Sequence, residues 1–395
     1  MTSVFYNLES NTWSHNEIDR PKVTLGHNRL LINHISIQDQ GKSTITFQVK
    51  KNQQHFGPII GILTNEDRFP FSGNIKTFKR ICKKIMNEGG IPVIFTPSAF
   101  SGTSLKCYTF CFQTKKWLEL FSPLPDVIYN RIPSVLYESN EQYKQFRNKL
   151  SELNIPFFNE SYLSKIGTMS LLSSDKFLSK YIPETIDLKT EEDLRIYLNK
   201  WNCIYIKKHH SAKGLGVFKI SLLKDNTVSI RNAFHVELIK ELKDCWKFLT
   251  SIREPYICQQ GINSKLPDGR KFDLRILVHK KDKQFIISGI GVRVGTPGGI
   301  TTHVPRGGSI IPLEELPIQL NEQLLQKIAQ LTGEALNQQQ GHFYEFSMDI
   351  GLHNGHYYIF EINSKPMVFD EVEIKEKGME NLIHLFYELS NFKPY

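Results

Sequence analysis

Several features are missing from this 395-residue chain, and each absence excludes a class of protein. It has no apolar run of 18 residues and no apolar core near its N-terminus, so neither a membrane-spanning helix nor a secretory signal peptide is predicted. The formal net charge is +9, yet no five like charges stand together, so a nucleic-acid-binding tail is not predicted. We therefore expect a cytoplasmic protein with neither a membrane nor a nucleic acid as partner.

Cysteine and the common nucleotide-binding motifs are also scarce. The six cysteines are scattered among apolar neighbours, and the close pair Cys107 and Cys111 has no second pair nearby to complete a zinc site. They are expected to be buried, reduced thiols. No GxGxxG follows the first predicted strand of the α/β region, and at the glycine-bearing loop after Lys207 no GKS or GKT opens a helix. A dinucleotide fingerprint and a Walker P-loop are therefore both excluded.

The composition is that of a folded globular protein, with 40% hydrophobic and 23% charged residues, and the length allows several domains. Short alternating bursts such as RLLINHISI and STITFQVKK predict a small β-rich module over residues 1–54. From Gly57 onward, apolar runs alternate with amphipathic helical patterns, which predicts a small parallel α/β sheet.

The most informative stretch runs from Tyr344 to Pro366, and its pattern predicts two antiparallel strands joined by a short turn. Asp349 lies on the first strand, while Glu361 and Asn363 lie two residues apart at the end of the second. The alternation of a strand places these side chains on one face. Two carboxylates and an amide suit magnesium and leave positions for phosphates. A solvated hairpin with charges at its end is the alternative.

A second motif is the glycine-bearing loop that follows Lys207. An apolar strand ends at this lysine, small residues that include Ser211, Gly214 and Gly216 follow, and a second strand carries the chain away. The backbone N–H groups of such a loop can hold phosphates, with the lysine as a fixed positive charge beside them. An ordinary turn between two strands is the alternative.

Two arginines follow on strands that are predicted to pair. Asp273 and Arg275 share one face of the strand in KFDLRILV, and Arg293 lies on the next strand. Guanidinium groups that face a carboxylate cluster suit phosphoryl transfer, because they spread positive charge over the transferring phosphate. Cross-strand ion pairing on an exposed sheet is the alternative.

Taken together, these motifs resemble the ATP-grasp superfamily. More narrowly, GPIIGILTNEDRFPF, PLPDVIYNRIPS, YICQQGI, KFDLRILV and THVPRGG are similar to segments of the YheC/YheD-like ATP-grasp proteins, which are associated with the endospore coat of bacilli. The resemblance implies an α/β (α+β) protein with the ATP-grasp fold and with ATP and Mg²⁺ as cofactors. Its implied parts are a β module (1–54), a pre-ATP-grasp α/β domain (55–160), an N-lobe with a glycine-rich flap (161–255) and a C-lobe with a magnesium site (256–395).

The resemblance also implies roles for single residues, and the sequence departs from the family pattern at a few of them. Lys208 stands where a proline often follows the strand lysine, and Gln260 replaces an acid. Thr302 and His303 stand near the position of a usual asparagine, so the carboxylate-binding part is expected to differ. The implied roles are phosphate binding for Lys176 and Lys207, the flap for Ser211, Gly214 and Gly216, the adenine pocket for Gln259, Gln260 and Ile262, neutralisation of the γ-phosphate and acyl phosphate for Arg275 and Arg293, and magnesium ligation for Asp349, Glu361 and Asn363.

The function implied is an ATP-dependent ligase that joins a carboxylate to an amine or a thiol through an acyl phosphate. Its implied substrates include a peptide or a protein of the spore coat. The alternative is a non-catalytic structural or nucleotide-binding coat protein that keeps the ATP-grasp shell. A basic nucleic-acid binder is a third hypothesis, with only the net charge in its favour.

Overall fold

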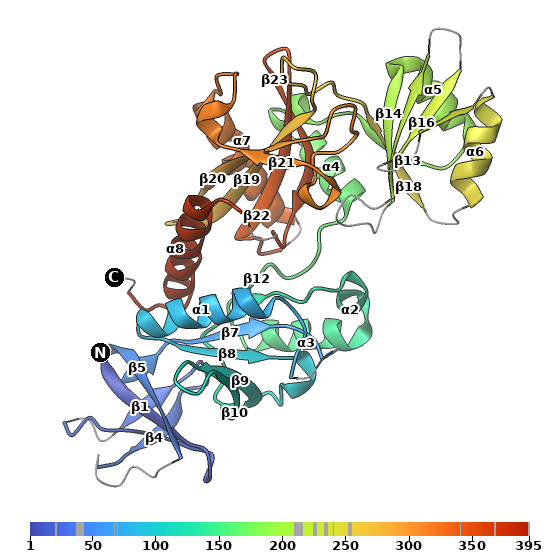
Figure 1. The fold of residues 1–395 in the computed structure, drawn as a ribbon. Coiled ribbons are helices and arrows are strands. Elements are labelled where there is room, and N and C mark those ends of the chain that lie inside the picture. The colour runs from blue at the N-terminus through green and yellow to red at the C-terminus, as the bar shows by residue number, and fades with distance from the viewer. Residues whose placement is uncertain are drawn as a thin grey trace.

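The computed structural model describes residues 1–19, 22–36, 43–66, 68, 70–208, 216–223, 227–232, 236–239, 241–251, 255–339, 341–366 and 369–393. These residues form a closed barrel and three open sheets. The barrel and the first open sheet lie together at one end of the molecule, where both chain termini are found (Figure 1). The two remaining sheets form the lobes at the opposite end (Figure 1).

The N-terminal strands close into a six-stranded barrel in the order β1-β2-β4-β3-β6-β5. Alternate residues such as Val4, Tyr6, Phe47 and Val49 fill its interior, and closure leaves no unpaired sheet edge. The strands are β1 (Thr2–Asn7), β2 (Thr12–His15), β3 (Val23–Leu25), β4 (Leu30–His34), β5 (Thr44–Asn52) and β6 (His55–Gly57).

The next sheet has the order β10-β9-β8-β7-β11-β12. Its β7, β8, β11 and β12 are parallel, as predicted, and the antiparallel β9–β10 hairpin extends it beyond the prediction. Helix α1 buries Phe78, Ile81, Cys82 and Ile85 on one face. The elements are β7 (Ile59–Leu63), α1 (Ile75–Asn87), β8 (Ile91–Phe95), β9 (Leu105–Cys111), β10 (Lys116–Ser122), β11 (Val127–Asn130), α2 (Val135–Ser139), α3 (Glu141–Glu152) and β12 (Phe157–Phe158).

The first lobe is an antiparallel sheet in the order β13-β18-β14-β15-β16-β17. Helices α5 and α6 cover one face and pack Leu194, Leu198, Cys245 and Leu249 on it. The other face carries Lys207, whose Nζ reaches the Phe360 carbonyl of the second lobe. The elements are β13 (Thr185–Leu188), α5 (Glu191–Trp201), β14 (Cys203–Lys208), β15 (Val217–Leu222), β16 (Val228–Arg231), β17 (Val236–Ile239), α6 (Leu242–Ser251) and β18 (Tyr256–Gln260).

The second lobe is a sheet in the order β21-β20-β19-β22-β23. Its core face, with Ile276 and Met348, packs on α4 and α7, while α8 covers part of the other face and extends to α1 (Figure 1). The segment after β20 contributes an edge strand, β21. The elements are α4 (Lys165–Ser174), β19 (Phe272–Lys281), β20 (Gln284–Val294), β21 (Ser309–Ile311), α7 (Glu322–Gln339), β22 (Glu345–His353), β23 (His356–Asn363) and α8 (Val372–Leu389).

All six cysteines are free thiols, as predicted, but Cys111 and Cys203 are only half-buried because they lie on an edge hairpin and at the start of β14. In the part of the chain that the structure describes, no helix combines the length and the apolar character that a bilayer span requires.

Candidate nucleotide and magnesium site

The β22–β23 hairpin holds three residues that we call the cage: Asp349, Glu361 and Asn363. Its turn contains Asn354 and Gly355 with φ of +51° and +77°, the left-handed conformation that two-residue hairpin turns of type I′ require. Asp349 is the ladder partner of Glu361, and Asn363 lies two residues further along the same strand. Cross-strand partners share a face, so the hairpin places the cage on one side of the sheet.

Arg293 connects the cage to Asp273. Its Nε and Nη2 donate to the two Asp273 carboxylate oxygens at 2.8 Å each, and Nη2 lies 2.9 Å from Asp349 Oδ2. Arg275 Nε lies 4.0 Å from Asp349 Oδ1. Burial raises the pKa of the Asp349 carboxyl, but the guanidinium groups of Arg293 and Arg275 outweigh burial and leave this pKa below its ordinary value. Asp349 is therefore charged at neutral pH.

Two buried polar atoms at this site lack a hydrogen-bond partner among the described residues: Asp349 Oδ1 and Arg293 Nη1. Leaving such a group unpaired costs about 1–3 kcal/mol, and more when it is charged. An unpaired anionic oxygen is a ligand that magnesium accepts, and an unpaired guanidinium N–H is a donor that a phosphate accepts. The residues present therefore fit a magnesium–nucleotide complex.

Two lysines approach the cage from the other lobe and from α4. Lys207 Nζ donates to Gln259 Oε1 at 2.7 Å and to the Phe360 carbonyl at 3.4 Å, while Lys165 Nζ lies 3.5 Å from Glu361 Oε1. All five residues line one small pocket. Burial lowers the pKa of Lys207 to about 8, although Glu361 opposes this effect. The pocket thus offers two cations beside a carboxylate.

The remaining described residues to which the resemblance assigns roles do not line this pocket. Lys176 is exposed on the turn after α4, and no described contact joins it to the cage. Gln260 pairs with Glu184: its backbone N–H donates to the Glu184 carbonyl at 2.9 Å and its Oε1 accepts from the Glu184 N–H at 3.4 Å. Ile262 is buried just beyond the end of β18. Gly216 precedes β15 with φ of +71°, whereas Ser211 and Gly214 lie outside the described residues.

Thr302 supports the arginine side of the site. Its Oγ1 donates to Asp273 Oδ2 at 2.6 Å, so the carboxylate that holds Arg293 is itself held. Burial lowers the pKa of the adjacent His303, and the charge of Arg293 lowers it further. The sequence marked Thr302 and His303 only as a departure from the family pattern. It did not indicate Lys165 at all, because a lysine in the first turn of a helix carries no motif.

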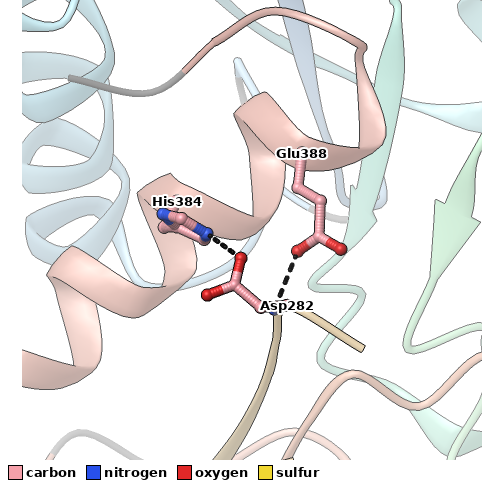
Figure 2. A group of neighbouring side chains, drawn as sticks. All are labelled: Asp282, His384 and Glu388. Atoms are coloured by element: carbon pink, nitrogen blue, oxygen red, sulfur yellow. Dashed lines mark hydrogen bonds and ion pairs between the residues drawn. The ribbon is translucent and has the colours of Figure 1, made fainter. Parts of the chain in front are cut away.

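Another group of possible metal ligands lies away from the cage, on the surface of the second lobe. Asp282, His384 and Glu388 each bring one ligand atom within 4.8 Å of the others (Figure 2). His384 Nε2 lies 3.1 Å from Asp282 Oδ1, and the Asp282 N–H donates to Glu388 Oε2 at 3.3 Å. Asp282 belongs to the β19–β20 turn, so these contacts attach that turn to α8. We assign this group a structural role.

The two lobes with the cage between them define an ATP-grasp protein. The VanG D-Ala:D-Ser ligase from Enterococcus faecalis, which is 13% identical, superposes with a TM-score of 0.50 and shares the fold over 84% of this chain and 99% of that one. The chain belongs to the YheC/D-like ATP-grasp family, whose model matches residues 154–391. The predicted fold class and family are therefore confirmed.

Two relatives of the chain are proteins of Bacillus subtilis (strain 168). The endospore coat-associated protein YheD is 23% identical over 334 residues, which cover 79% of this chain and 73% of the relative. The endospore coat-associated protein YheC is 25% identical over 302 residues, which cover 71% of this chain and 82% of the relative.

Proposed function

We propose that this protein is an ATP-dependent ligase that joins a carboxylate to an amine or a thiol through an acyl phosphate. The observation that carries the proposal is the charged, buried Asp349, which is the ladder partner of Glu361 and has one oxygen that accepts no hydrogen bond from the described residues. A retained but idle nucleotide shell has no need for such a group. We propose further that it acts in the cytoplasm on a peptide or a protein of the spore coat; the names of the relatives support the association with the coat.

Each part of the site would have a separate task. Lys207 and Lys165 would hold the ATP phosphates, and Arg275 and Arg293 would offset the charge that develops on the γ-phosphate and the acyl phosphate. The cage would hold Mg²⁺, which would offset the negative charge of the phosphates. Positioning and electrostatics account for this chemistry, so no side-chain nucleophile is required.

The test is whether ADP release from ATP and Mg²⁺ depends on a carboxylate. We would offer amino acids, short peptides and acidic coat-protein tails, and follow both ADP and the mass gain of the acceptor. Glu361→Gln should nearly abolish this turnover with little change in melting temperature, because it removes a metal-binding charge but keeps the shape. Glu380→Gln, an exposed change on α8, is the control.

Two results would contradict the ligase. One is hydrolysis that is insensitive to every carboxylate offered, and the other is a Glu361→Gln protein with unchanged turnover. A protein that binds ATP and Mg²⁺ but releases no ADP under any condition would be the non-catalytic, nucleotide-binding coat protein.

A further inference from the structure

A second pocket lies between α1, α8 and the sheet of the second lobe. Its cavity volume is about 80 Å³, several times the roughly 10–15 Å³ that one water molecule needs, so it has room for a small side chain. Most of its wall is apolar: Ile81 comes from α1, Ile374 and Met379 come from α8, Phe369 precedes α8, and Leu277 comes from β19. We call it the α1–α8 pocket.

The α1–α8 pocket adjoins the cage. Leu277 follows Arg275 by two residues on β19, so the two side chains share a face about 7 Å apart. The guanidinium carbon of Arg275 lies 5.6 Å from the centre of the Phe369 ring, which forms part of the pocket wall. Pro366, also in the wall, follows Asn363 by three residues. The wall of the α1–α8 pocket is therefore next to the cage and to Arg275.

Ser347 lies between the two sites. It is the ladder partner of Leu277 on one side and of Asn363 on the other. The side chain is fully buried, and its Oγ has no hydrogen-bond partner among the described residues. A buried hydroxyl without a partner is costly, so a polar group of a ligand at this position would be stabilised.

The charges around the α1–α8 pocket disfavour a cationic occupant. Glu345 is the acidic residue among those that line it, and this carboxylate already accepts from the Tyr129 hydroxyl and lies 3.3 Å from His279 Nε2 and 3.7 Å from Arg131 Nη1. Lys375 is also in the wall, and its ammonium has no ion pair within the described part of the chain. An ammonium group in this pocket would therefore meet positive charge and no available acid.

We propose that the α1–α8 pocket receives the apolar side chain of the carboxylic acid that the site activates. This inference rests on the proposed ligase function and specifies its substrate class. With the side chain against Leu277 and Phe369, the carboxylate would lie at Arg275 and Ser347, next to the cage. In the first step a carboxylate oxygen of the acid bonds to the γ-phosphorus of ATP, the bond from that phosphorus to the bridging oxygen breaks, and ADP leaves with the electron pair.

A panel of N-acetyl amino acids tests the inference, because each member carries one reacting carboxylate and a different side chain. With hydroxylamine as nucleophile, ADP and hydroxamate are measured for N-acetyl-leucine, N-acetyl-phenylalanine, N-acetylglycine and Nα-acetyl-lysine. We expect kcat/KM for the leucine and phenylalanine compounds to exceed that for the glycine and lysine compounds by about 10-fold or more, since removing even one methylene from an apolar pocket costs at least that factor.

Two variants test the place of binding. Thr77→Trp adds a ring at the pocket wall from a half-buried position on α1, and should raise KM for N-acetyl-leucine about 10-fold while the melting shift with ATP and Mg²⁺ stays unchanged. Lys375→Glu should raise KM several-fold by repelling the carboxylate. Lys377→Glu is the matched control, because it makes the same charge change on the same helix at an exposed residue outside the pocket.

The outcomes separate the two proposals. The inference about the pocket would be wrong if kcat/KM were equal across the panel, if the lysine compound were preferred, or if KM were unchanged in both pocket variants. The ligase proposal would still stand in these cases, provided that ADP release depended on a carboxylate. ADP release that no carboxylate stimulates would overturn the ligase and the inference together.

Discussion

Replacing Lys207 by Met tests the phosphate side of the site through two independent measurements. The first is stability. Burial lowers the pKa of this lysine from 10.5 to about 8, which corresponds to a cost of about 3 kcal/mol for keeping the charge in the folded protein below pH 8. The unfolded chain binds the proton more tightly, so stability should rise as pH increases from about 8 to 10.5. This part of the pH dependence should disappear in the variant.

The size of the stability change follows from the contacts. Removing the ammonium removes the burial cost of about 3 kcal/mol but also two hydrogen bonds, to Gln259 and to the Phe360 carbonyl, worth about 1 kcal/mol each. We therefore expect the nucleotide-free variant to be more stable at pH 7 by about 1 kcal/mol. Binding of ATP and Mg²⁺ should weaken by about 1–3 kcal/mol, or roughly 5- to 150-fold, because a charged hydrogen bond to phosphate is lost.

Chemical denaturation between pH 7 and 10.5 and calorimetric titration with ATP and Mg²⁺ supply the two measurements. Lys189→Met, an exposed change in the same lobe, is the control and should alter neither. The calorimetry also measures proton uptake on binding. The wild-type protein should take up protons when it binds ATP at pH 8, because the phosphates raise the pKa of Lys207. If the variant binds ATP as tightly as wild type, Lys207 does not contact phosphate.

Two further predictions concern the metal and the second lysine. ATP with Mg²⁺ should raise the melting temperature clearly more than ATP with a chelator, because Asp349 and Glu361 without a cation repel the triphosphate; equal shifts would remove the cage from the nucleotide site. Lys165→Met should weaken ATP binding by about 1–3 kcal/mol, because Lys165 lies beside Glu361, whereas Lys176→Met should have a smaller effect; the reverse order in a calorimetric titration would restore the role that the family pattern gives to Lys176.

Much of the cage could be predicted because its geometry is local. The positions of Asp349, Glu361 and Asn363 relative to one another depend on strand alternation and on one short turn, and both are encoded within about twenty residues. The arrangement also depends on a bulge that the sequence did not predict. Counted residue by residue from the turn, Asp349 would pair with Phe360 and Glu361 would lie on the opposite face; the bulge between Asp349 and Ile350 shifts the register by one residue and pairs Asp349 with Glu361. The alignment of Arg275 with Asp349 is different, because it joins strands about seventy residues apart and local alternation does not determine it.

Other features depend on contacts between distant segments and could not be predicted. The pattern of residues 1–54 predicts strands, but the closed order β1-β2-β4-β3-β6-β5 requires parallel pairs between β2 and β4 and between β3 and β6, which alternation alone does not specify. Lys165 reaches Glu361 only because α4 packs beside β23. The α1–α8 pocket needs two helices that stand almost three hundred residues apart in the chain.

The cations of the site are held by groups outside the cage. Arg293 is fixed by two hydrogen bonds to Asp273, which Thr302 holds in turn, and Lys207 is fixed by Gln259. Donors that are already oriented need little rearrangement when charge develops on a phosphate, and this lowers the cost of the reaction step. Asp349 shares only one oxygen with Arg293; its other oxygen lies 4.0 Å from Arg275 Nε and accepts no hydrogen bond from the described residues. Entry of a magnesium ion would therefore leave the Asp273–Arg293 pair in place.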